Sequence, residues 1–123
     1  MSSLKELSYL GSPYTHKDPK VMKKRFDKVC WAASVLMRSG VLAFSPIAHS
    51  HPIANYGTPG SWDFWKRFDY GVIRGCCKEV LVLMLDGWEK SVGLTAELNY
   101  ARRNKIPVKM LSLDDLMEIE RGL

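Results

Sequence analysis

The sequence predicts a three-layer α/β domain, in which helices cover both faces of a parallel sheet of four or five strands. Three observations lead to this prediction. Segments typical of strands alternate with segments typical of helices, which favours one parallel sheet with right-handed crossovers. Residues 80–85 are a continuous apolar run, as expected of a central strand buried on both faces. The length of 123 residues fits a single domain that spans residues 1–123.

The first half of the chain predicts two strands with a long helix between them. A short apolar run at residues 7–10 ends in Gly-Ser-Pro, which is typical of a strand that enters a loop. Asp18 followed by Pro19 predicts a helix start, because aspartate caps helices and proline fits the first helical position. Apolar residues then recur at helical spacing as far as Gly40. Residues 41–44 are the second predicted strand, and residues 46–60 are expected to form a long loop.

The second half continues the same alternation. Ser61 can cap the next helix, whose apolar residues share one stripe. These residues are Trp65, Phe68, Val72, Ile73 and Cys76. A buried strand is predicted at residues 79–85, followed by a turn at Asp86-Gly87 and a helix from about residue 91 to residue 104. The last predicted elements are a strand at residues 106–111 and a helix with Ser112 and Asp115 as its capping box.

Composition argues against several classes of protein. The longest apolar run is far shorter than the ~20 residues of a membrane span, and MSSLKELSYL lacks the charged leader and apolar segment of a signal peptide. Cys30, Cys76 and Cys77 are odd in number and have no C-x-x-C spacing. We therefore expect a reducing, cytoplasmic location, with neither a metal nor a cofactor.

The net charge is +5, and the bases are scattered along the chain. One predicted helix contains Lys23, Lys24, Arg25 and Lys28, and another segment contains Arg102, Arg103 and Lys105. We interpret these bases as solvated helix faces, with attraction of a small anionic ligand as the alternative. No recognition helix or basic stripe is evident, so we expect no nucleic-acid partner and no membrane partner. Because a domain of this size has a modest core, we expect a homodimer or a higher homo-oligomer.

Three predicted loops follow the carboxyl ends of strands, where open α/β sheets bind ligands. The first contains Gly11, Ser12 and Pro13: glycine lets a ligand approach the backbone, and the hydroxyl can bind phosphate or sugar. An ordinary tight turn is the alternative. The third loop leads to Ser91 and Gly93 at a helix N-terminus, a position that favours anions.

Two carboxylates could carry chemistry. Glu97 flanks the inward face of its predicted helix, and a surface position is the alternative. Asp69 falls within the apolar stripe of the preceding helix. Desolvation there should hold its proton more tightly, which suits a general acid; a buried aspartate that caps a loop or pairs with an arginine is the alternative.

Histidines and tryptophans supply further candidates. His49 and His51 could line a base or sugar pocket, make structural hydrogen bonds, or bind a metal, although two ligands do not make a site. Trp62, with Trp65 and Tyr56, could stack on a nucleobase, and helix packing is the alternative.

Four segments resemble the nucleoside 2-deoxyribosyltransferase-like superfamily, specifically its small branch of the DUF1937 type. They are YLGSPYT, FSPIAHSHP, WKRFDYGVI and the VGLTAEL segment after LVLMLDGW, and the resemblance covers almost the whole chain. It implies a flavodoxin- or Rossmann-like fold and cleavage of the bond between a base and the sugar C1′.

The resemblance also implies roles for individual residues. Glu97 matches the nucleophile, Asp69 the carboxyl group that handles the proton of the departing base, and Tyr9 the tyrosine that orients the nucleophile. Gly11 and Ser12 match the sugar and phosphate loop. Ser91 stands where deoxyribosyltransferases carry an aspartate that holds the sugar hydroxyls. We therefore expect a hydrolase of a (deoxy)nucleoside 5′-monophosphate, with base exchange or a non-catalytic nucleotide sensor as alternatives.

Overall fold

The computed structural model describes residues 5–123 and confirms the α/β prediction. Within these residues the sheet has four strands, all parallel, in the order β2-β1-β3-β4. The strands are β1 (Leu7–Gly11), β2 (Ala43–Phe44), β3 (Cys77–Leu83) and β4 (Val108–Leu111). The predicted domain limit at residue 1, and the first four residues of the segment inspected for a signal peptide, lie outside the described residues.

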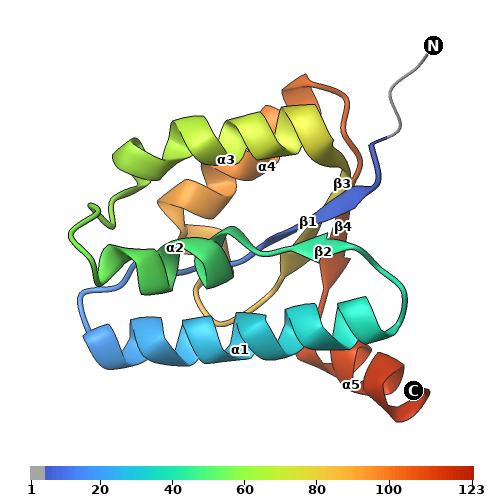
Figure 1. Cartoon of the computed structure of the whole chain (residues 1–123). Helices are drawn as coiled ribbons and strands as arrows, with labels where there is room; N and C mark the ends of the chain where they lie inside the picture. The colour runs from blue at the N-terminus through green and yellow to red at the C-terminus, as the bar shows by residue number, and fades with distance from the viewer. Residues whose placement is uncertain (1–4) are drawn as a thin grey trace.

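Helices cover both faces of the sheet (Figure 1). On one face lie α1 (Pro19–Arg38) and α5 (Leu113–Arg121), and on the other lie α3 (Trp62–Cys76) and α4 (Val92–Arg103). A short 3-10 helix, η1 (Trp88–Lys90), precedes α4. None of the helices described is long and apolar enough to cross a membrane.

Alternation along the strands divides the core in two. Leu10, Leu81 and Leu83 pack in the cluster under α1, whereas Tyr9 and Val80 pack in the cluster under α3 and α4. Successive side chains of a strand point to opposite faces, which explains this division. Tyr9, near the carboxyl end of β1, is thereby directed at α4.

The predicted helix starts are confirmed by their capping contacts. Asp18 accepts a hydrogen bond from the Lys20 amide at 2.9 Å at the start of α1, and Ser61 caps α3. Ser112 and Asp115 form the predicted capping box of α5. Side-chain caps satisfy amides that the first turn leaves unpaired, which fixes where each helix begins.

The prediction of a loop at residues 46–60 is wrong for its first part, which forms α2 (Pro46–Ala54). Ser45 caps this helix by accepting from the Ala48 amide at 3.0 Å, and Pro46 occupies the first helical position, which needs no amide hydrogen. Pro52 lacks the amide that would pair with the carbonyl of Ala48, so α2 forms with one helical hydrogen bond fewer. The helix packs on α1 and β1.

Several predicted boundaries and two residues of the predicted stripe also differ from the structure. The predicted strands at 79–85, 41–44 and 106–111 are shifted or shortened to Cys77–Leu83, Ala43–Phe44 and Val108–Leu111. Phe68 and Cys76 were expected in the apolar stripe of α3, but Phe68 is 46% exposed and Cys76 is also exposed. Asp69 and Ile73 are the buried side chains of α3, and Phe68 lies about 100° around the helix from Asp69.

Candidate active site

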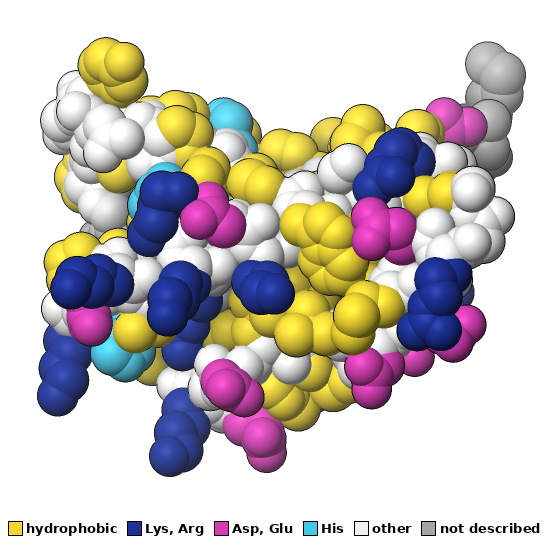
Figure 2. Space-filling view, turned by 90° about the horizontal axis from the view of Figure 1, so that it is seen from below, with side chains coloured by type: hydrophobic (Ala, Val, Ile, Leu, Met, Phe, Trp, Pro, Cys, Tyr) yellow, Lys and Arg dark blue, Asp and Glu magenta, His cyan; other side chains and the backbone are white. Residues whose placement is uncertain are grey.

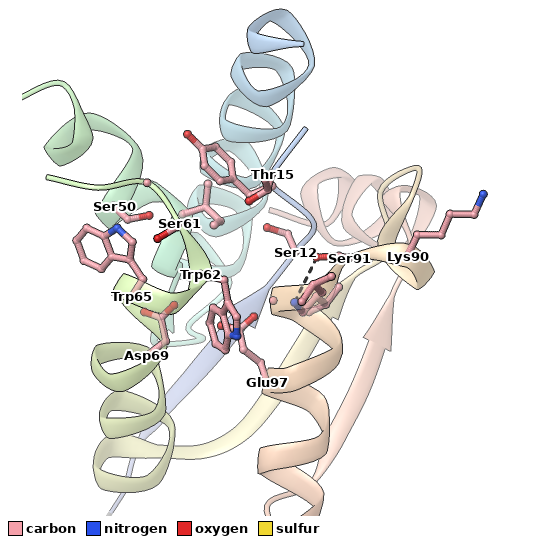
Figure 3. A pocket seen from close by; sticks show the side chains of 16 residues that line it. Ser12, Thr15, Ser50, Ser61, Trp62, Trp65, Asp69, Lys90, Ser91 and Glu97 are labelled. Atoms are coloured by element: carbon pink, nitrogen blue, oxygen red, sulfur yellow. Dashed lines mark hydrogen bonds between the residues drawn. The ribbon is translucent and has the colours of Figure 1, made fainter. Parts of the chain in front are cut away.

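A cavity of about 320 Å³ lies beyond the carboxyl ends of β1 and β3. Its walls come from the loop after β1, from α2, and from the N-terminal parts of α3 and α4 (Figure 3). The predicted site residues that line it are Ser12, Trp62, Asp69, Ser91, Gly93 and Glu97. Residues from separate segments therefore meet at the edge of the sheet where open α/β folds bind ligands.

Glu97 lies on α4 with 4% of its surface exposed, and Tyr9 donates its hydroxyl hydrogen to Glu97 Oε2. Gly11 lies behind the cavity wall, next to α4. A Cβ at that position would lie 2.9 Å from Leu94 Cδ1 and 3.9 Å from Glu97 Oε1, so a larger residue would displace the Leu94 side chain.

Asp69 reaches the same cavity from α3 and is also buried (Figure 3). Burial raises the pKa of Asp69 to about 7, and the nearby Tyr9 hydroxyl opposes this shift less strongly. Burial raises the pKa of Glu97 to about 8, and the charge of Asp69 adds to the effect while the Tyr9 hydrogen bond opposes it. The prediction that Asp69 titrates above an ordinary aspartate is confirmed.

The two carboxyl groups titrate as a pair. Removing both protons would place two negative charges in one poorly solvated cavity, so the pair retains a proton near neutral pH. Burial and the neighbouring carboxylates raise the pKa of Tyr9 well above its usual value, so this hydroxyl stays a donor. The Tyr9 hydroxyl opposes the upward pKa shift of both carboxyl groups, and its hydrogen bond holds the Glu97 carboxyl group in place. The cavity thus combines one carboxylate with one carboxylic acid.

The N-terminus of α4 forms one end of the cavity. Ser91 caps the helix by accepting from the Leu94 amide at 3.2 Å, which leaves its own hydroxyl hydrogen free to donate. The amides of Val92 and Gly93 open the first turn, at the positive end of the helix dipole. Ser12 lines the same cavity, and its buried Oγ has no hydrogen-bond partner among residues 5–123. Two serine hydroxyls and a helix start therefore surround a place suited to an anion.

Basic side chains gather near this end of the molecule. Figure 2 shows Lys and Arg side chains over the N-terminal half of α1, with acidic side chains toward α5. The first loop joins the end of β1 to the start of α1, so these charges lie at the end of the molecule that contains the cavity. They would attract an anionic ligand modestly, and salt would screen them.

Two tryptophans form an apolar wall. Trp62 and Trp65 line the cavity, and Trp65 Nε1 donates to the carbonyl of Pro59 at 2.8 Å. Trp62 packs on α4 at Gly93, where a Cβ would lie 3.3 Å from the indole ring. Both rings are held in place, so they offer flat surfaces on which a planar ligand could stack.

His49 and His51 lie on α2 and do not line the cavity. His49 stacks on Phe68 with ring centroids 5.1 Å apart, and its buried Nδ1 has no partner among the described side chains. His51 stacks on Phe26 at 4.2 Å and its Nδ1 is hydrogen-bonded to the Tyr14 hydroxyl. The expectation that both line the pocket assumed a loop; helix α2 turns them toward neighbouring aromatics instead. Pro13 is likewise packed behind the wall.

Sequence analysis missed a residue that connects the cavity loops. Arg25, counted there among the solvated bases, donates to the carbonyls of Tyr14 at 3.3 Å, Thr15 at 3.2 Å and Asp86 at 3.0 Å. It thereby ties the first loop, which contains lining residues, to the turn before α4. Arg25 lies beside Phe26 on the half-buried side of α1, which could have indicated that it is not fully solvated. Helical spacing alone does not reveal that its partners are backbone carbonyl groups.

Comparison with known proteins adds one match. A family model described as "Domain of unknown function (DUF1937)" matches residues 6–113. The matched segment contains all four strands of the sheet and every residue that lines the cavity. A search of curated proteins found no match to the chain.

Proposed function

The chain belongs to the DUF1937 family, and we propose that it is a hydrolase that cleaves the N-glycosidic bond of a (deoxy)nucleoside 5′-monophosphate and releases the free base. The observation that carries the proposal is the pairing of Glu97, held by Tyr9, with Asp69 in one cavity. Glycosidic cleavage uses such a pair, one carboxylate as the nucleophile and one acid to protonate the leaving group. The motif resemblance to nucleoside 2-deoxyribosyltransferase-like enzymes adds support.

The first step forms a bond between Glu97 and the sugar. The ionised carboxylate attacks C1′, the C1′–N bond breaks, and its electron pair leaves with the base. Asp69 gives its proton to the base, so the base departs neutral. Tyr9 orients the attacking carboxylate throughout.

The second step returns the enzyme to its starting state. Asp69, now ionised, takes a proton from a water molecule whose oxygen attacks C1′ and displaces Glu97. One water is consumed, and the products are the free base and the sugar 5-phosphate. These steps use only side chains of this chain and require no cofactor or metal.

The 5′-phosphate is assigned to the start of α4. Ser91, the open amides of its first turn and the unpartnered Ser12 hydroxyl support this assignment, because each can donate to a phosphate oxygen. An aspartate at position 91 would repel the phosphate. The base would lie against Trp62 or Trp65.

Two alternatives use the same cavity differently. Base exchange would pass through the same intermediate with a second base in place of water, and Ser91 in place of an aspartate argues against transfer between free nucleosides. A non-catalytic sensor need not bury two carboxyl groups, since their desolvation costs stability. The unpaired state of all three cysteines supports a location in a reducing cytoplasm. The small size of the ligand site favours a small-molecule ligand over a nucleic acid.

The test is a panel of ribo- and deoxyribonucleosides and their 5′-monophosphates, with free base and sugar phosphate quantified by chromatography. We expect both products in equal amounts from at least one monophosphate, with no exchange into an added second base. Glu97→Gln, a nearly isosteric change, should lower the rate by roughly three orders of magnitude or more while circular dichroism stays unchanged. Release of no base from any substrate, or equal release by Glu97→Gln, would refute the proposal.

A further inference from the structure

The outward side of α3 is apolar, although exposed helix faces are normally polar. Phe64 is 50% exposed and Phe68 is 46% exposed. Gly71 and Gly75 face open space, because a Cβ at either position would meet nothing within 4 Å. With spacings of four, three and four residues, these positions form one line along the helix. Three of them, Phe64, Phe68 and Gly71, border a groove of about 520 Å³ that is also lined by Trp65, Arg67, Val72 and Cys76.

The order of residues along this line is self-complementary. The two bulky rings occupy its N-terminal half and the two glycines its C-terminal half. If a second α3 lies antiparallel, Phe68 comes opposite Gly71 and Phe64 comes opposite Gly75. The midpoint of positions 68 and 71 and the midpoint of positions 64 and 75 coincide between residues 69 and 70. A single two-fold axis at that point therefore places the two phenylalanine rings of each copy over the glycines of the other. Small residues opposite large ones allow close helix packing.

One pair of opposite charges beside the line fits the same alignment. Asp63 lies near the start of α3 and Arg74 near its end, on the same flank. Their midpoint is within about one residue of the axis defined above, so Asp63 of each copy comes opposite Arg74 of the other. The contact of Asp63 with Lys66 at 3.4 Å is exposed and weak, and it would not prevent this exchange. A parallel alignment would leave Asp63 and Arg74 at opposite ends of the contact.

We propose that this surface of α3 is the interface of a two-fold symmetric homodimer in which the two α3 helices pack antiparallel. The expectation of a homo-oligomer came from chain size alone, whereas this inference identifies the surface and the alignment. Because α3 spans about 22 Å at 1.5 Å per residue, the contact lies at the small end of specific interfaces, and a dissociation constant on the order of micromolar is expected. The interface does not depend on the proposed activity.

The test is analytical ultracentrifugation of the full chain between about 1 and 200 μM, the range that a micromolar dimer requires. We expect a monomer–dimer equilibrium in the wild type and a monomer throughout for Gly71→Arg. Arginine favours a helix more than glycine does and the site faces solvent, so this variant should fold at least as well as the wild type. Tyr56→Arg, at a 91% exposed position off the line, is the matched control and should dimerise normally.

The alignment is tested by exchanging charges. Asp63→Arg and Arg74→Asp should each weaken the dimer about tenfold, and the double variant should restore it, because the opposite charges then meet again. A wild type that stays monomeric at the highest concentration would overturn the proposal. A dimer unaffected by Gly71→Arg would show that the interface lies on another surface. Failure of the double variant to recover the wild-type dimer affinity would overturn the antiparallel arrangement.

Discussion

The hydroxyl of Tyr9 carries one proton, and the structure directs it to Glu97. A carboxylate that accepts a hydrogen bond is favoured in its charged form, so this contact opposes the upward pKa shift that burial gives Glu97. In the proposed mechanism Glu97 attacks as the carboxylate, and Asp69, on another helix, gives its proton to the leaving base. Tyr9, which would orient the attacking group, is a residue of β1 that does not itself line the cavity.

The role of Asp69 as the acid can be tested through the leaving group. Asp69→Asn should lower kcat for release of a natural base by about 10²–10⁴-fold, because asparagine cannot supply the proton. A substrate whose leaving group departs as a stable anion, such as a p-nitrophenyl 2-deoxyribofuranoside 5-phosphate, should lose far less. Steady-state rates on both substrates measure the difference. An equal loss on both would contradict the acid role.

Sequence patterns predicted some of these residues better than others. Asp69 could be found from spacing because it falls in an apolar stripe, and burial is what changes its proton affinity. Glu97 could not, since helical spacing left it at the edge of the inward face, and only the motif resemblance assigned it a role. The contacts of His49 and His51 depend on the path of α2, which local sequence did not reveal.

At the scale of the element, the proposed phosphate site at the start of α4 would decide which substrate is accepted. Ser91→Asp should keep the helix cap, because aspartate caps as well as serine, but it adds a negative charge beside the proposed phosphate. We expect a strong preference of the wild type for the monophosphate, measured as kcat/KM against the free nucleoside. The variant should abolish or reverse that preference.

The control for this variant is its thermal stability, which should match that of the wild type if the cap is retained. Equal kcat/KM for nucleoside and monophosphate in the wild type would contradict phosphate binding at α4. Free-nucleoside hydrolysis or transfer would then become the better interpretation.

Helix α2 shows why one element escaped prediction. Ser45-Pro46 has the same form as Asp18-Pro19, a capping residue followed by proline at the first helical position. The signal was outweighed by Pro52 and by the glycines that follow, which favour a loop. Pro52 removes one helical hydrogen bond, and packing of α2 against α1 and β1 stabilises the segment in spite of that loss. Tertiary contacts of this kind are not visible in local sequence.

At the scale of the whole molecule, the alternation of strands and helices was enough to predict the fold. The buried run of β3 placed the centre of the sheet correctly, because a strand covered on both faces must be apolar throughout. The order of the strands and the loop contacts of Arg25 could not be predicted, since they depend on which segments meet in space.

The buried carboxyl pair also makes the stability of the protein depend on pH. The pKa of each group is raised in the folded state, to about 7 for Asp69 and about 8 for Glu97, so the folded protein binds more protons than the unfolded chain from about pH 4 to 8. The contribution of these two groups to the free energy of unfolding is therefore greatest below pH 4. This contribution is lost as the pH rises through 7 and 8. We expect Glu97→Gln to melt at least about 4 °C above the wild type at pH 8, since glutamine carries no charge to bury.

Melting curves of the wild type and Glu97→Gln at pH 5 and pH 8 measure this effect. The gain from the substitution should be larger at pH 8, where the wild-type carboxylate is ionised. Glu89→Gln, a matched change at an exposed position, should shift neither curve. A gain of equal size at both pH values would show that the charge of Glu97 is not the cause.

The tryptophan wall of the cavity gives the protein an internal optical probe. Two of its four tryptophans, Trp62 and Trp65, line the cavity, and the other two do not. A purine or pyrimidine stacked on an indole quenches its emission, so titration with a nucleotide would report occupancy through intrinsic fluorescence without a label. Because this signal needs binding and no turnover, it can be read from Glu97→Gln, in which a bound substrate would remain intact.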